Sequence, residues 1–225
     1  MRHTYFAVQQ LEKSADIYIF GDIVRQEKSE RDVATNGIIG QIKALDAEKI
    51  NVYIDSYGGA VSEGWAIYNA LREHPAQVDT YGMGFVASAA VFPFLAGENR
   101  YASNISAYYL HQVMIGVAGY AEDLRAAANE ADMMTEIGIH AFVDRTNMNA
   151  DTVRELMRAE TWLTPDQALE HGIATAILAD TAPKYTQDAK RAIMQSLFQT
   201  KPPREKQEKQ KPAGIMQTIA GIFNN

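Results

Sequence analysis

Ser88 lies in a stretch of small and apolar residues whose types could support nucleophilic chemistry. The segment 81–97 predicts a strand, a tight turn and a buried helix, with Ser88 at the start of the helix. The first N–H groups of a helix have no partner within it, so they are available to an oxyanion beside the hydroxyl. Serine is also a favoured N-cap of any helix, so this stretch alone leaves a purely structural role open.

A general base must accompany a serine nucleophile, and the chain has 5 histidines. Four of them are explained by a place at the terminus, at the ends of predicted helices or inside one: His3, His74, His171 and His140. His111 instead follows the apolar run 105–110, which predicts a strand, and side chains converge on a crevice where strands end. His111 is therefore the candidate base, although a histidine at a strand end is also often structural.

The pair Gly58–Gly59 directly follows the predicted strand 50–55 and could supply a second donor for an oxyanion. Glycines let the backbone approach a ligand closely and present N–H groups without interference from side chains. Ordinary tight turns use the same pair, so it is weak evidence by itself. The sequence has neither a Gly-x-x-x-x-Gly-Lys motif nor a Gly-x-Gly-x-x-Gly motif after a strand, so we predict no nucleotide site.

Strands and helices alternate along the chain, which predicts an α/β fold with a largely buried sheet. Apolar runs bounded by turn residues predict strands at 16–20, 50–55, 77–81, 100–102 and 105–110. Helical spacing predicts helices near 38–45, 61–73, 88–97, 121–146 and 151–157. Another helix opens at Thr164, where Pro165 suits the first position and Gln167 completes a capping box, and it ends at Gly172.

The segment 121–146 predicts the longest helix of the chain. Its apolar residues recur at helical spacing, and we expect six residues to form its buried stripe: Leu124, Ala128, Ala131, Met134, Ile137 and Phe142.

The length of 225 residues, with 47% hydrophobic and 22% charged residues, fits one globular domain and an appendage. We therefore expect an N-terminal segment at 1–15, a domain at 16–182 and a tail at 183–225. The chain has no Cys, which excludes disulfides, a thiolate nucleophile and a Cys-based zinc site. Without an apolar leader or a long apolar run, we expect a soluble, cytoplasmic protein that has no membrane segment.

Charge is distributed unevenly between the predicted domain and the predicted tail. Residues 1–182 hold 13 Lys or Arg against 25 Asp or Glu, whereas residues 183–225 hold 8 against 3. The negative domain argues against nucleic acid as its main ligand. The tail is rich in Lys, Glu, Gln and Pro, which predicts disorder, and its end, GIMQTIAGIF, is apolar enough for a short docking helix or is simply unused.

Four segments occur in the order found in the ClpP family: DSYGGAVSEG at 55–64, GFVASAA at 84–90, LHQ at 110–112 and ETWLTPDQALEHGIA at 160–174. From about residue 16 to residue 178 the chain resembles the proteolytic subunit of Clp protease. Within that family it is most similar to the ClpP-like head maturation proteases of tailed phages and prophages. The four ordered segments together are far more specific than any one of them.

The resemblance implies a role for each candidate residue. Ser88 matches the nucleophile of the family and His111 its general base, and Glu160 stands where the family usually has the triad Asp. A glutamate is one methylene longer but can still orient and compensate an imidazolium. The N–H groups of Gly59 and Ala89 match the oxyanion hole.

Two substitutions depart from the pattern of the family near these residues. Tyr57 replaces the usual Pro of Ser-Pro-Gly-Gly, and Val113 replaces the usual Pro after His-Gln. We expect both to loosen the geometry of their loops without removing chemistry.

The resemblance also implies a fold and an activity. The fold would be the ClpP/crotonase-like spiral of ββα units with a long handle helix, which matches 121–146. The activity would be that of a serine endopeptidase acting on proteins or peptides, without a cofactor or a metal. The chain would form homo-oligomeric rings, as a heptamer or stacked heptamers.

Its partners would be capsid or scaffold proteins of a phage, or an ATP-driven unfoldase, with no nucleic acid and no membrane involved. It would act in the bacterial host cytoplasm or inside a phage procapsid. Two alternatives stay open: a crotonase-type acyl-CoA enzyme, and a non-catalytic ring or scaffold subunit.

Overall fold

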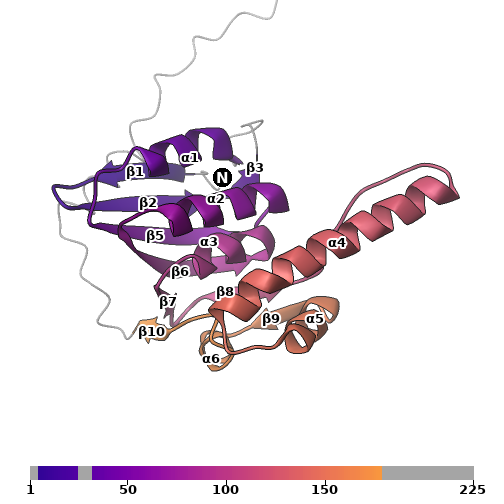
Figure 1. Cartoon of the computed structure of the whole chain (residues 1–225). Coiled ribbons are helices and arrows are strands. Elements are labelled where there is room, and N and C mark those ends of the chain that lie inside the picture. The colour runs from indigo at the N-terminus through magenta and orange to yellow at the C-terminus, as the bar shows by residue number, and fades with distance from the viewer. Residues whose placement is uncertain (1–4, 25–31, 179–225) are drawn as a thin grey trace, which may run out of the picture. The chain divides into compact units, whose positions relative to one another are not determined.

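A computed structural model describes residues 5–24 and 32–178 of the chain (Figure 1). The predictions for the tail at 183–225 lie outside these residues, as do residues 1–4 of the N-terminal segment. Within the described residues, no helix combines the length and the apolar character that crossing a membrane requires.

The core of the protein is an 8-stranded sheet in the order β1-β2-β5-β6-β7-β10, and β8 pairs with both β6 and β9. Neighbouring strands are parallel except in the pairs β1·β2 and β8·β9. The strands of this sheet are β1 (Tyr5–Gln10), β2 (Ser14–Phe20), β5 (Lys49–Ser56), β6 (Gln77–Ala87), β7 (Asn99–Ser103), β8 (Ala107–Leu110), β9 (Thr161–Leu163) and β10 (Ala176–Leu178). A second sheet pairs β3 (Asp22–Val24) with β4 (Asp32–Ala34).

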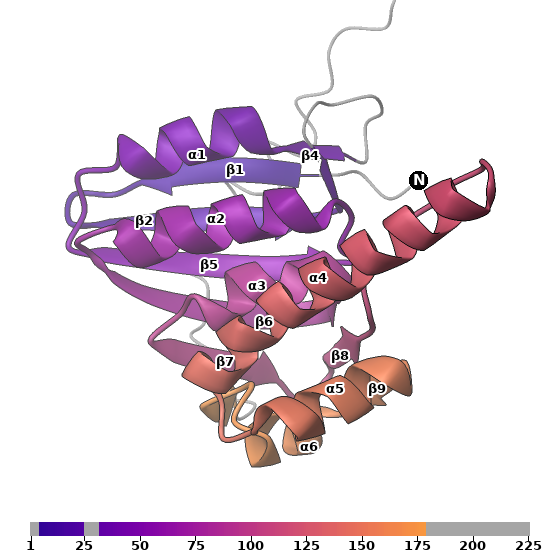
Figure 2. The ribbon, with the colours of Figure 1, turned by 45° about the vertical axis from the view of Figure 1, so that its right-hand side comes forward.

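Three helices cover one face of the large sheet: α1 (Thr35–Lys43), α2 (Val61–Glu73) and α3 (Val91–Leu95) (Figures 1 and 2). Alternate residues of β2 and β5 point to this face, and the register pairs Ile17 with Val52 and Ile19 with Ile54. All four side chains are fully buried. Burial of such side chains contributes about 1.5–3 kcal/mol each, so this layer fixes the strands that end at the site.

The alternate residues of four neighbouring strands form a row of stacked tyrosine rings. Tyr18, Tyr53, Tyr81 and Tyr101 lie with successive ring centroids 5.1, 4.8 and 5.0 Å apart. Because side chains of neighbouring strands in register share a face, the row belongs to the face opposite the buried Ile and Val side chains.

The chain leaves the sheet after β8 and forms α4 (Ala121–Arg145), α5 (Ala150–Arg158) and α6 (Pro165–Glu170). In both views α4 extends well beyond the sheet (Figures 1 and 2). The expected buried stripe along α4 is wrong at three of its six positions: Leu124 and Ala128 in the first half of the helix and Ile137 in the second half are exposed. The residues of α4 that are buried lie in its second half, where the helix packs on the body: Thr135, Gly138, Ile139 and Phe142.

Several predicted elements have the expected bounds, and some strands were missed. The helix 61–73 and the capping box of Thr164 and Gln167 are confirmed. The strand predicted at 77–81 continues to Ala87, because its second half pairs with β8. The strands β1, β3, β4, β9 and β10 have no counterpart in the sequence predictions.

Candidate active site

Ser88 lies where the longest strand of the sheet ends and a helical segment begins. It is the first residue of a single 3₁₀ turn, η1 (Ser88–Ala90), which continues into α3. Its φ angle is 56°, a left-handed conformation that costs a non-glycine residue roughly 1–3 kcal/mol. The next three residues, Ala89, Ala90 and Val91, are almost completely buried and hold this conformation in place. The predicted strand, tight turn and helix around Ser88 are therefore confirmed.

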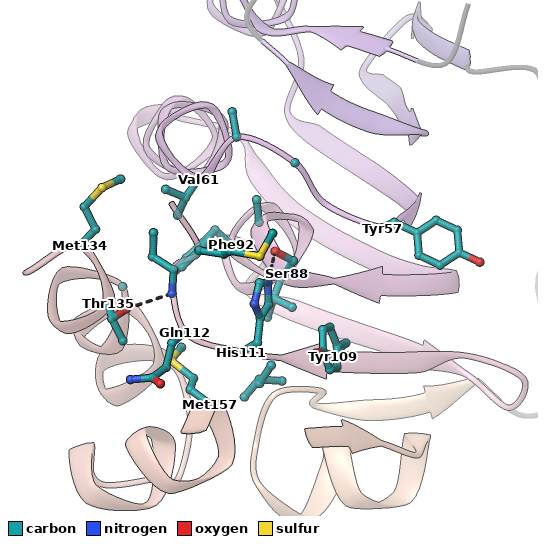
Figure 3. Close-up of a pocket in the computed structure, with 18 of the residues that line it drawn as sticks. Tyr57, Val61, Ser88, Phe92, Tyr109, His111, Gln112, Met134, Thr135 and Met157 are labelled. Atoms are coloured by element: carbon teal, nitrogen blue, oxygen red, sulfur yellow. Dashed lines mark hydrogen bonds between the residues drawn. The ribbon is translucent and has the colours of Figure 1, made fainter. Parts of the chain in front are cut away.

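His111 lies beside Ser88 because β6 and β8 are parallel neighbours. The register pairs Ala87 with Tyr109, so the residues that follow the two strands meet at the same edge. The Oγ atom of Ser88 and the Nε2 atom of His111 are 2.6 Å apart, within hydrogen-bond distance (Figure 3). The structure thus places His111, the candidate base, beside Ser88.

The protonation state of His111 allows it to act as a base. Burial lowers the pKa of His111, and the negative charge of Glu160 opposes this effect without reversing it. The imidazole is therefore neutral at neutral pH, as acceptance of a proton from a serine requires.

The segment after His111 is fastened to α4. The N–H of Val113 donates to the Oγ1 atom of Thr135 over 3.0 Å (Figure 3). The hydroxyl of Thr135 in turn donates to the carbonyl of Ala131 over 2.8 Å. A proline at position 113 would have no N–H to give. The expectation that Val113 loosens this segment is therefore wrong, because a hydrogen bond to a buried threonine holds it.

The Gly58–Gly59 turn lies against the backbone that carries Ser88. Gly58 and Gly59 have φ angles of 94° and 142°, which favour glycine. A Cβ atom on Gly58 would lie 2.7 Å from the Cβ atom of Ser88 and 2.8 Å from the nitrogen of Ala89. Glycine is thus required here for the close approach of the two backbone segments.

The hydrogen bonds around Gly59 determine where its N–H points. Gly59 forms a parallel bridge with Ile23, whose N–H donates to the carbonyl of Gly58 and whose carbonyl accepts from the N–H of Ala60. In a parallel bridge these two bonds leave the N–H of the central residue on the opposite side. Gly59 and Ala89, the two predicted oxyanion donors, line the same cavity as Ser88.

Glu160 lies at the rim of the site, in the exposed connection between α5 and β9. Its φ angle is 50°, and its Oε2 atom accepts a hydrogen bond of 3.4 Å from the hydroxyl of Tyr109. Within residues 5–24 and 32–178, no hydrogen bond joins Glu160 to His111. The structure thus brings Ser88, His111, Gly59 and Ala89 together and places Glu160 close enough for its charge to act on His111.

A cavity of about 450 Å³ opens beside Ser88 and His111. Apolar side chains from α2, α3, α4 and α5 form much of its wall: Val61, Val91, Phe92, Met134, Phe142 and Met157 (Figure 3). A cavity of this size and lining suits an apolar group placed close to the hydroxyl. The described residues contain no group of three or more His, Asp or Glu that could hold a metal ion.

Three residues of the site were missed in the sequence: Tyr109, Thr135 and Trp162. Tyr109 could have been found, because a residue two positions before His111 in a strand shares its face of the sheet. Thr135 and Trp162 reach the site through contacts between distant segments, for which the sequence carries no local signal.

Comparison with known proteins links this geometry to a family. The Clp protease family matches residues 2–181 of the chain. The ATP-dependent Clp protease proteolytic subunit 2 of Treponema pallidum is 32% identical over 181 residues, which cover 77% of this chain and 87% of that protein. The subunit 2 of Borreliella burgdorferi is 33% identical over 175 residues, which cover 74% and 83%.

A solved structure shares the fold. A point mutant of ClpP1 from Listeria monocytogenes has a TM-score of 0.63 and 24% identity, covering 74% of this chain and 92% of that chain. The predicted ClpP-like α/β fold is confirmed.

Proposed function

The chain belongs to the Clp protease family of serine-type peptidases, and we propose that Ser88, His111 and Glu160 are the residues with which it cleaves peptide bonds. The observation that carries the proposal is the distance of 2.6 Å between the Ser88 hydroxyl and Nε2 of His111. The neutral imidazole and the unusual backbone of Ser88 support it, since strained residues cluster at functional sites.

The reaction begins when His111 takes the proton of Ser88 as the hydroxyl oxygen attacks the carbonyl carbon of a peptide bond. The resulting oxyanion accepts hydrogen bonds from the N–H groups of Gly59 and Ala89. His111 then gives its proton to the leaving amine, and the acyl group stays on Ser88. Water, activated in the same way by His111, attacks the ester and releases the second product.

Glu160 completes the proposed triad by turning one carboxylate oxygen to the Nδ1–H of His111. A carboxylate in this place holds the imidazole in the correct tautomer and stabilises the imidazolium that forms. The charge of Glu160 already raises the pKa of His111 against the effect of burial, which supports this role.

Hydrolysis of a fluorogenic peptide with an apolar residue before the scissile bond tests the proposal. Ser88→Ala should reduce turnover to background, while Ser62→Ala, on the exposed surface of α2, should leave it unchanged. Circular dichroism should show the same secondary structure in both variants. Turnover by Ser88→Ala protein at the wild-type rate would falsify the assignment.

We also propose that the chain assembles into homo-oligomeric rings that stack through α4. The support is a set of exposed apolar side chains on α4 and the segment before it: Met114, Val117, Tyr120, Leu124, Met133 and Ile137. Exposed apolar groups of this extent typically mark contacts between proteins. Multi-angle light scattering should give the mass of a heptamer or of two heptamers, and a monomer at micromolar concentration would contradict the proposal.

Two forms of the proposed function differ in the proteins that would be cleaved. The relatives are named ATP-dependent, which supports proteins delivered by an ATP-driven unfoldase, whereas the motif resemblance supports capsid or scaffold proteins of a phage. We favour the unfoldase-fed form. Degradation of a folded protein only when an unfoldase and ATP are present would support it, and cleavage of purified scaffold protein without ATP would support the other form.

The crotonase-type alternative makes a different prediction at the same cavity. An acyl-CoA enzyme would use paired N–H donors but would have no need of the contact between Ser88 and His111. Calorimetric titration with an acyl-CoA should therefore show no binding.

A further inference from the structure

The ring of Tyr109 stacks on the rings of His111 and Trp162, and its hydroxyl lies beside Glu160. Its ring lies 5.2 Å from the ring of His111 at an interplanar angle of 15°. It lies 4.6 Å from the ring of Trp162 at 23°, because β8 and β9 pair Tyr109 with Trp162. Two near-parallel neighbours restrict the rotation of the Tyr109 ring and, through it, the plane of the imidazole.

The hydroxyl of Tyr109 reaches the carboxylate of Glu160. It donates to Oε2 over 3.4 Å, which leaves Oε1 for another donor. Burial, the charge of Glu160 and this hydrogen bond raise the pKa of Tyr109, so that the phenol stays protonated and remains a donor. Tyr109 thus contacts both His111 through its ring and Glu160 through its oxygen.

A glutamate needs such support more than an aspartate does. Its side chain has one more rotatable bond, and Glu160 is exposed, so packing does not select its rotamer. The left-handed backbone at Glu160 sets the direction in which the side chain leaves the chain, but not where the carboxylate ends. Among the described residues, the hydroxyl of Tyr109 is the hydrogen-bond partner of this carboxylate.

We propose that Tyr109 is a positioning residue for the triad. Its hydroxyl holds one oxygen of Glu160 so that the other oxygen can accept the Nδ1–H of His111, and its ring keeps the imidazole plane in line with Ser88. This inference rests on the proposed function, because it requires Glu160 to act as the triad acid.

Tyr109→Phe separates the two roles, since it keeps the stacked ring and removes the oxygen. The turnover number kcat should fall roughly tenfold, the effect of losing one hydrogen bond to a charged group, while KM stays within about twofold. Tyr101→Phe removes the same oxygen from the tyrosine row on the sheet and should change neither constant.

The pH dependence of kcat/KM distinguishes a positioning role of Tyr109 from a merely structural role, because a structural role would not shift it. The ionisable groups that face His111 within the described residues are Glu160, which precedes β9, and Tyr109 on β8. The charge of Glu160 raises the pKa of His111, so a carboxylate that drifts away lets this pKa fall. The acid limb of kcat/KM should therefore move to lower pH in Tyr109→Phe, in the same direction as in Glu160→Gln.

The double variant tests whether Tyr109 acts through Glu160. Tyr109→Phe combined with Glu160→Gln should be no slower than Glu160→Gln alone, because the hydroxyl then has no carboxylate to position. Independent, multiplying losses would overturn the inference, and so would an unchanged or raised kcat in Tyr109→Phe. If Glu160→Gln has wild-type activity while Ser88→Ala has none, the serine peptidase stands and both the acid role of Glu160 and the inference fall.

Discussion

The two ends of the proposed triad are built differently. Ser88 continues directly into buried residues of η1 and α3, and its backbone is packed against the Gly58 turn. Glu160 lies in an exposed connection, and within the part of the chain that the structure describes its carboxylate accepts one long hydrogen bond, from Tyr109. The buried core therefore fixes Ser88, whose hydroxyl must contact the substrate. Glu160, which only orients the base, is held by surface contacts, and substitutions can change such contacts more freely.

Replacement of His111, which joins the two ends, should have the largest effect. His111→Gln removes the base and should lower kcat on the order of 10⁶-fold, as loss of the base does in other serine peptidases. The fold should remain, since the ring is only partly buried. Steady-state hydrolysis and thermal unfolding of the same preparation measure both effects, and a loss below tenfold would mean that another group accepts the proton.

Gly58→Ala tests the buried end of the triad, where the Gly58 turn packs against the backbone of Ser88. A Cβ atom there would lie 2.6 Å from the carbonyl oxygen of Ala87, in a backbone conformation that alanine rarely adopts. Displacement of the oxyanion donors should lower kcat roughly 10²–10³-fold, and the strain should reduce the free energy of unfolding by about 1–3 kcal/mol.

Gly37→Ala on α1 is the matched control, because space is open there apart from the tip of Gln41, and it should change neither quantity by much. Wild-type kcat in a folded Gly58→Ala variant would show that this turn does not support the site.

Glu160→Gln tests the exposed end of the triad, the carboxylate of Glu160. It should lower kcat by about 10²-fold, less than the roughly 10⁴-fold loss seen for a buried triad aspartate, because water partly replaces an exposed carboxylate. Since the charge of Glu160 raises the pKa of His111, the acid limb of kcat/KM should move to lower pH. Glu160→Asp keeps the charge and serves as the control; an acid limb that moves to higher pH in Glu160→Gln would contradict this account.

Thr135→Val should have the smallest effect, because it acts on the segment after His111 and not on the triad. It removes the acceptor of the Val113 N–H, which should cost about 1 kcal/mol of stability and lower kcat a few-fold. Val113→Pro removes the donor of the same bond, so the two variants should resemble each other and their combination should add little. Chemical denaturation and peptide hydrolysis measure these effects.

The sequence predicted the surroundings of Ser88 well and those of Glu160 poorly, for physical reasons. Ser88 lies at a strand-to-helix turn with local signals, and the neighbouring strands that bring His111 to it are apolar runs. The stacking of Tyr109 on Trp162 and the hydrogen bond from Val113 to Thr135 depend on contacts between segments far apart in the chain. The predicted burial of the apolar stripe along α4 was wrong where the helix is exposed. Helical spacing identifies such a stripe but does not show whether another element covers it.

The strands β1, β3, β4, β9 and β10 were missed for a related reason. Their sequences are short or mixed in polarity, and pairing with a neighbour stabilises them more than local preference does. Strand β1, for example, pairs with β2 over six residue pairs from Tyr5↔Phe20 to Gln10↔Ala15.

Labelling with a fluorophosphonate, followed by mass spectrometry of the tryptic peptides, tests the central claim most directly. A serine activated by His111 should carry the phosphonate at Ser88 in the wild-type protein, and the label should disappear in His111→Gln. Labelling of a different serine, or equal labelling of Ser88 in both proteins, would contradict the claim that the 2.6 Å contact between Ser88 and His111 is the catalytic pair.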